Sequence, residues 1–220
     1  MAKYQHTSPE NTGPVTTGRT IHWANRYDLF VSLVMLGRAG AFRRHTADLA
    51  HLQSGERVLD VGCGTGDLTL AIEKQVGPNG KVVGIDAASE MITYARQKAT
   101  RLGSVADFRV EPVEALSFAD HTFDVVISSL AFHHFPAPLK EQALVEIRRV
   151  LKPGGRVLIV DALRSSHHFF PHPALKVGVE DLPPLLKDAG FLDVQWQRGP
   201  LPFIGVVRGQ TALEESAKRF

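Results

Sequence analysis

The stretch Val58-Leu-Asp-Val-Gly-Cys-Gly-Thr-Gly-Asp-Leu68 decides how this chain folds. Its apolar start predicts a buried strand, and three glycines spaced G-x-G-x-G predict a tight turn that leads into a helix. An α/β protein uses this arrangement to bring its backbone close to a ligand, because glycine has no Cβ. A dinucleotide-binding turn would place glycine or alanine at the position of Asp67. A nicotinamide- or flavin-dependent oxidoreductase is therefore kept only as an alternative.

Length and composition indicate one medium-sized domain with a terminal extension. The chain has 220 residues, of which 44% are hydrophobic, enough for a sizeable core. A net charge of +2 is too small to predict nucleic-acid binding, which usually needs clustered lysine and arginine. The single cysteine, Cys63, excludes a disulfide framework, and its place in the glycine turn indicates a packing residue rather than a nucleophile. The N-terminus shows no apolar signal segment, so we expect a cytoplasmic protein.

The N-terminal quarter divides into two parts ahead of the main domain at 53–220. Residues 1–20 are polar and predict a flexible arm, and residues 21–52 predict a helical lid. The apolar run at 27–36 spans about ten residues, whereas a transmembrane helix needs ~20, so no transmembrane segment is expected. This run either packs on the domain's own sheet or meets a membrane surface or lipophilic substrate. A second helix is expected at 42–52, with its arginines exposed.

After residue 54 the pattern alternates strands and helices with short turns, which predicts an α/β fold with a parallel sheet covered on both faces. Helices are expected at 68–76, 89–102, 138–151 and 180–189, and a tight turn at 152–155. The expected parallel strands are 57–61, 81–85, 107–110, 123–128 and 156–160, and a terminal antiparallel pair is expected at 191–196 and 203–207.

Five ordered motifs carry a family resemblance. They are Tyr27-Asp-Leu29, Val58 to Gly66, Gly84-Ile-Asp86 with Met91, Phe123-Asp-Val-Val126 and Leu151-Lys-Pro-Gly-Gly155. Over residues 23–209 the chain resembles the class I S-adenosylmethionine-dependent methyltransferases, in the branch of the ubiquinone and menaquinone C-methyltransferases. The resemblance implies a Rossmann-like, seven-stranded, mostly parallel sheet and S-adenosylmethionine as cofactor. It also implies methyl transfer to a small, lipophilic or aromatic acceptor, such as a quinol, a phospholipid amine or a secondary metabolite. A protein that binds S-adenosylmethionine without transferring its methyl group is the other alternative.

The resemblance also implies which residues bind the cofactor. Asp86 follows the second strand, where a carboxylate can accept both ribose hydroxyls, and Met91 would lie against the adenine. The chain departs from the family at Pro112, where an aspartate usually accepts from the adenine amino group, so Glu111 or the Val113–Glu114 segment would replace it. The implied cofactor-binding residues are Tyr27, Asp60, Gly62, Cys63, Gly64, Gly66, Asp86, Ala87, Met91, Val113, Glu114 and Ser129.

His133 and His134, after the fourth strand, are the candidate catalytic residues. A phenol or enol acceptor must lose a proton, and histidine titrates in the right range, although a structural role fits either residue too. Histidines 167, 168 and 172 match no metal-site spacing, and no metal is expected. We expect a small-molecule substrate, no nucleic acid, a monomer or homodimer and, as an open alternative, peripheral membrane contact. The 21–52 segment is expected to place Tyr27 near the cofactor and Trp23, Phe30 and Met35 around the acceptor.

Overall fold

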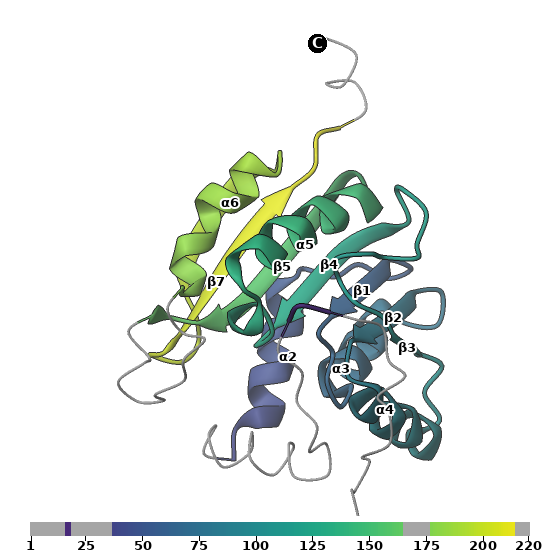
Figure 1. The fold of residues 1–220 in the computed structure, drawn as a ribbon. Helices are drawn as coiled ribbons and strands as arrows, with labels where there is room; N and C mark the ends of the chain where they lie inside the picture. The colour runs from purple at the N-terminus through teal and green to yellow at the C-terminus, as the bar shows by residue number, and fades with distance from the viewer. Residues whose placement is uncertain (1–15, 19–36, 165–176, 214–220) are drawn as a thin grey trace, which may run out of the picture.

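A seven-stranded sheet forms the centre of the computed structural model, which describes residues 16–18, 37–164 and 177–213 (Figure 1). The strand order is β3-β2-β1-β4-β5-β7-β6. The strands are β1 Arg57–Val61, β2 Lys81–Asp86, β3 Asp107–Val110, β4 Phe123–Ser129, β5 Leu151–Ala162, β6 Leu192–Arg198 and β7 Ile204–Gln210. The first five strands pair in parallel, and β7 pairs antiparallel with β5 and β6. The predicted α/β class with a mostly parallel seven-stranded sheet is confirmed.

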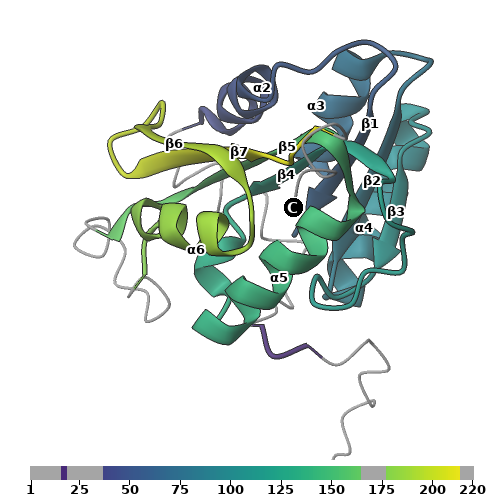
Figure 2. The ribbon, with the colours of Figure 1, turned by 90° about the horizontal axis from the view of Figure 1, so that it is seen from above.

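Helices cover both faces of the sheet (Figure 2). One face carries α2, α3 and α4, and the other carries α5 and α6. The helices are α2 Ala39–Leu49, α3 Asp67–Val76, α4 Ser89–Leu102, α5 Ala137–Val150 and α6 Leu182–Asp188, with short 3-10 helices η1 Phe132–His134 and η3 Val179–Asp181. Side chains of a strand alternate between these layers, so Val58 packs with α2 and α3 while its neighbour Leu59 packs with α5.

Burial on both faces explains the near-continuous apolar strands. Val125, Val126 and Ile127 of β4 are each 0% exposed, and full burial of such a side chain contributes about 1.5–3 kcal/mol. Strand β1 lies between β2 and β4, so the chain winds outward from β1 in both directions. In open α/β sheets, ligands bind at the carboxyl ends of the strands where the winding direction changes. The fold thus places the glycine turn after β1 at the expected binding edge.

Three boundaries differ from the sequence prediction. The tight turn expected at 152–155 is instead a bulge inside β5, because Leu151 pairs with Phe123 and Arg156 already pairs with Val125. The helix expected at 42–52 begins earlier, and its residues Ala39 and Phe42 share a core with α3 and the sheet. The helix expected at 180–189 is divided between η3 and α6.

The N-terminal expectations fall largely outside the described residues. Positions 1–15 and 19–36, which include the expected apolar run, and positions 165–176, which include three histidines, are not described. Residues 16–18 of the expected flexible arm lie against the carboxyl edge of the sheet, where the N–H of Thr17 donates to Glu114 over 3.3 Å. Among the helices that the structure describes, none is long and apolar enough to cross a membrane.

Candidate active site

The glycine turn after β1 is shaped by the protein itself. Gly62 and Gly64 have φ values of +70° and +53°, in the left-handed region that favours glycine. A Cβ on Gly62 would lie 2.4 Å from the Cβ of Ala131. The N–H groups of Gly62 and Cys63 both donate to the Ile85 carbonyl over 2.9 Å, and that of Gly64 donates to Asp86 over 3.0 Å. These three N–H groups are already engaged within the protein, so at Gly62 and Gly64 the turn offers a ligand a backbone surface without Cβ atoms.

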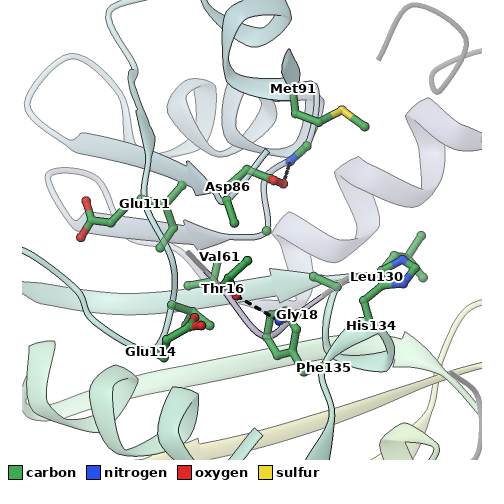
Figure 3. Close-up of a pocket in the computed structure, with 16 residues that line it drawn as sticks. Thr16, Gly18, Val61, Asp86, Met91, Glu111, Glu114, Leu130, His134 and Phe135 are labelled. Atoms are coloured by element: carbon green, nitrogen blue, oxygen red, sulfur yellow. Dashed lines mark hydrogen bonds between the residues drawn. The ribbon is translucent and has the colours of Figure 1, made fainter. Parts of the chain in front are cut away.

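Two pockets meet at this turn. The larger lies along the ends of β1, β2 and β4 (Figure 3), and the smaller lies between the turn, α2 and the first turn of α3. Gly62, Gly64 and Leu130 line both pockets, so the two pockets are adjacent at this turn. The first pocket is lined by Thr16, Gly18, Val61, Gly62, Gly64, Ile85, Asp86, Ala87, Met91, Glu111, Val113, Glu114, Leu130, Ala131, His134 and Phe135. The second is lined by Phe42, Arg43, Asp60, Gly62, Cys63, Gly64, Thr65, Asp67, Leu68, Ser129 and Leu130.

Asp86 ends β2 and faces the first pocket (Figure 3). Its Oδ2 accepts from the N–H of Gly64 over 3.0 Å and its Oδ1 from the N–H of Ala88 over 2.8 Å. Burial raises the pKa of this carboxyl, and the two backbone hydrogen bonds partly oppose that rise. A carboxylate oxygen accepts two hydrogen bonds, so Asp86 is held in place and can still accept from a pair of hydroxyls.

Asp60 lies at the second pocket and is 1% exposed. Burial raises its pKa to about 7; the hydrogen bond from the Thr69 hydroxyl, over 2.6 Å, lowers the pKa, and the charge of Asp86 raises it again. A cation beside this buried carboxyl would lower its pKa and stabilise the ionised form, so the site suits a positively charged ligand group. Cys63 in the same pocket is buried, and burial raises its pKa, so it stays a thiol and does not act as a nucleophile.

Glu111 and Glu114 differ at the far end of the first pocket. Glu111 accepts from both the backbone N–H and the hydroxyl of Ser117, and its carboxylate points away from the pocket (Figure 3). Glu114 turns its carboxylate toward the pocket, where Oε1 accepts from Thr17. Its Oε2 is buried and has no hydrogen-bond partner among the described residues. A buried carboxylate oxygen without a partner is costly, so Glu114, rather than Glu111, is suited to accept from a ligand.

The two candidate catalytic histidines have different surroundings. His133 faces Asp161 at the end of β5: its backbone N–H donates to Oδ2 over 2.9 Å, and its Nδ1 lies 2.7 Å from Oδ1. Burial alone would raise the pKa of Asp161, but the charge and hydrogen bonds of His133, together with the N–H of Ala162, hold it below its usual range. His134 lines the first pocket, with its ring centroid 3.9 Å from that of His133. The structure thus brings only His134 of the pair to the pocket wall.

Leu130, at the wall shared by the two pockets, was missed by sequence reasoning. It has φ +57°, which is strained for a branched, bulky residue, and such strain clusters at functional sites. The sequence feature that could have identified Leu130 as a site residue is its position directly after Ser129, at the end of a central strand. Arg43 was also missed, because it was expected to be exposed; it lines the second pocket and pairs with Asp67 over 2.8 Å.

Most predicted cofactor residues meet at the two pockets, and two predicted site residues do not. Gly66 lines neither pocket; a Cβ there would lie 2.7 Å from the Phe108 ring, so it serves packing. His133 also lines neither, and Tyr27 lies outside the described residues. Those that line at least one pocket are Asp60, Gly62, Cys63, Gly64, Asp86, Ala87, Met91, Val113, Glu114, Ser129 and His134. Within the described ranges, no group of three His, Cys, Asp or Glu side chains could hold a metal ion.

Residues 52–190 match the family model described as "Methyltransferase domain". The chain belongs to this family. Among its relatives, the ubiquinone/menaquinone biosynthesis C-methyltransferase UbiE of Pasteurella multocida is 38% identical over 165 residues, covering 70% of this chain and 61% of the relative. The demethylmenaquinone methyltransferase of Lactiplantibacillus plantarum is 39% identical over 141 residues, covering 63% of this chain and 58% of the relative. The chain thus spans about three fifths of the length of these relatives.

Solved structures share the fold of this methyltransferase-domain chain. A SAM-dependent methyltransferase from Aquifex aeolicus superposes with a TM-score of 0.71 at 27% identity, covering 80% of this chain and 93% of that one. The cyclase SpnF also gives a TM-score of 0.71, at 18% identity, covering 87% of this chain and 94% of that one. At that identity the second likeness shows the fold alone. Because a cyclase shares this fold, function must be argued from the site.

Proposed function

We propose that this protein is an enzyme that transfers a methyl group from S-adenosylmethionine to a small, lipophilic or aromatic acceptor, with a quinol-like ring as the first candidate. The observation that carries the proposal is the pair of adjacent pockets at the carboxyl edge of the sheet, whose polar groups match the parts of this cofactor. Relatives named as quinone C-methyltransferases, at 38% and 36% identity, support the class of acceptor.

The described residues fit the cofactor part by part. Asp86 would accept from the ribose hydroxyls, and Met91, Val113 and Glu114 would bind adenine, with Glu114 Oε2 accepting from its amino group. Asp60 would lie beside the cationic amino group of the methionine end, whose positive charge would favour the ionised carboxylate. When bound, S-adenosylmethionine supplies a methyl group on a sulfonium, which needs no further activation of the leaving group. The protein must therefore mainly position the acceptor and exclude water.

We assign proton removal from the acceptor to His134. Transfer to a phenol or enol carbon or oxygen requires loss of a proton, and among the described residues His134 is the histidine that lines the pocket. His133 has a different role, because Asp161 holds both its backbone and its ring. This anchoring fixes η1 on the end of β5 and so positions His134. His133 is then a positioning residue.

The arrangement around Asp67 argues against a nucleotide-dependent oxidoreductase. In a dinucleotide-binding fold the pyrophosphate lies at the start of the helix after the glycine turn. Here the first helical residue, Asp67, places a carboxylate there. A dinucleotide-binding turn has glycine or alanine at this position for close packing of the helix on the strand, whereas Asp67 is larger and is ion-paired with Arg43 and Lys98.

We propose that the N-terminal segment completes the acceptor pocket as a lid, with Tyr27 near the cofactor. Support comes from Thr16 and Gly18, which line the first pocket although they precede the whole sheet in sequence. We further propose a cytoplasmic monomer or homodimer that binds no nucleic acid; the small net charge of +2 supports only the last part, the absence of nucleic-acid binding.

Two measurements test this function. Titration calorimetry should show binding of S-adenosylhomocysteine and none of NADH; the reverse result would identify an oxidoreductase. Transfer of a labelled methyl group should then be measured with reduced quinones, phospholipid amines and simple phenols. Label in the quinol product confirms the proposal, whereas cofactor binding without transfer to any acceptor supports a binding protein.

A further inference from the structure

The second pocket contains a cationic group that the proposed reaction has not used. Arg43 of α2 reaches the pocket with 20% of its side chain exposed, and its Nη1 lies 2.8 Å from Oδ2 of Asp67. Lys98 of α4 lies 2.6 Å from Oδ1 of the same carboxylate. Three elements, α2, α3 and α4, thus bring two cations to one carboxylate. The three side chains together carry one net positive charge, and Arg43 is the cation among them that lines the pocket.

The position of this charge matches one end of an amino acid. The proposed cofactor would extend from the first pocket past Gly62 and Gly64 into the adjacent second pocket, which is lined by Asp60 as well as Arg43. Asp60 suits an amino group, because a cation beside this buried carboxyl favours its ionised form. The N–H groups of Gly62, Cys63, Gly64 and Gly66 donate within the protein, so a carboxylate beside these residues needs another donor. A guanidinium has five N–H donors in a planar fork, and the contact to Asp67 uses Nη1.

We propose that Arg43 binds the carboxylate of the cofactor's methionine end, and that Asp67 positions the guanidinium for it. This inference rests on the proposed function and adds a named residue to it. Asp67, held by Lys98 at the same time, keeps Arg43 directed into the pocket while the site is empty.

The test compares two cofactor probes that differ only in the carboxylate: S-adenosylmethionine and decarboxylated S-adenosylmethionine. Binding of each is measured by titration calorimetry to the full-length wild type and to Arg43→Gln. We expect Arg43→Gln to weaken S-adenosylmethionine about tenfold to a hundredfold, because a charge-assisted hydrogen bond is lost. The decarboxylated probe should bind both proteins within about twofold. Arg44→Gln is the matched control, since Arg44 is the exposed neighbour on α2.

Each outcome decides the inference. An equal loss for both probes in Arg43→Gln means that Arg43 only supports the shape of the pocket, and overturns the proposal. Unchanged binding of both probes overturns it as well. Arg43→Lys, which keeps the charge, should recover part of the affinity for S-adenosylmethionine only. If the wild type binds neither probe, the proposed function fails together with this inference; if the wild type binds and only the Arg43 result differs, the function stands.

Discussion

Replacement of Asp60 by asparagine should change how the stability of the empty protein depends on pH. The side chain is 1% exposed and has a pKa of about 7 in the folded protein, against an ordinary value of 3.8. Asparagine has nearly the same shape, can still accept from Thr69 and cannot ionise. The folded wild type keeps a proton on Asp60 that the unfolded chain releases above pH 4. Its free energy of unfolding therefore falls as the pH rises from about 4 to about 7.

The size of the effect follows from the same difference. At about 1.36 kcal/mol for each pH unit, the full difference between 3.8 and about 7 corresponds to about 4 kcal/mol. About 2 to 3 kcal/mol of this lies between pH 5 and pH 8. All other titratable groups are the same in the two proteins. The difference in unfolding free energy, Asp60→Asn minus wild type, should therefore rise by about 2 to 3 kcal/mol from pH 5 to pH 8. Urea denaturation of both empty proteins at the two pH values measures it.

A control variant and a ligand-binding measurement accompany the Asp60→Asn comparison. Asp188→Asn, at an exposed position on α6, should follow the wild type at both pH values. At pH 8, Asp60→Asn should also bind S-adenosylmethionine about tenfold more weakly, because the carboxylate beside the amino group is lost. Parallel pH curves for wild type and Asp60→Asn would refute the assignment of a raised pKa to this buried carboxyl.

Four further outcomes are expected. Asp86→Ala should weaken S-adenosylhomocysteine about tenfold to a hundredfold in calorimetry; unchanged affinity would remove the ribose assignment. Glu114→Ala should weaken it about tenfold, and Glu114→Gln much less, because an amide oxygen still accepts; equal losses would contradict an acceptor role. His134→Gln should lower kcat by about 10² with little change in cofactor affinity. His133→Gln should chiefly lower the free energy of unfolding, by about 3 kcal/mol as measured by urea denaturation. The opposite pattern would exchange the roles of the two histidines. Deletion of residues 1–36 should abolish labelled methyl transfer while circular dichroism still shows a folded domain; full activity would exclude a lid.

Local patterns were sufficient for most of the architecture. Strand β1 begins and ends at the predicted residues, 57 and 61, because an apolar run lies between a charged start and a glycine turn. The alternation of strands and helices predicted the parallel sheet, and the residues at strand ends 60, 86 and 129 meet at the two pockets as expected. These features depend on periodicity and on the common edge shared by parallel strands.

Features set by distant parts of the chain were not predictable. Lys152–Gly155 carries a proline and two glycines, which favour a turn, but Gly154 donates to the Ala212 carbonyl and Thr211 donates to the Gly155 carbonyl. These contacts with a remote segment keep the stretch within β5. Arg43 likewise reads as an exposed helix residue until α3 places Asp67 beside it. Local propensity contains no information about either partner.

We expect the short segment 16–18 to affect how fast ligands are exchanged. Thr16 and Gly18 form part of the wall of the first pocket, and the N–H of Thr17 donates to Glu114 over 3.3 Å, a long hydrogen bond. A spent cofactor that leaves across this wall must first displace the segment, so its departure is coupled to a movement of the N-terminus. Such opening steps, rather than bond formation, limit turnover in many enzymes. Changes in this segment would then act on product inhibition and residence time without touching the reacting atoms.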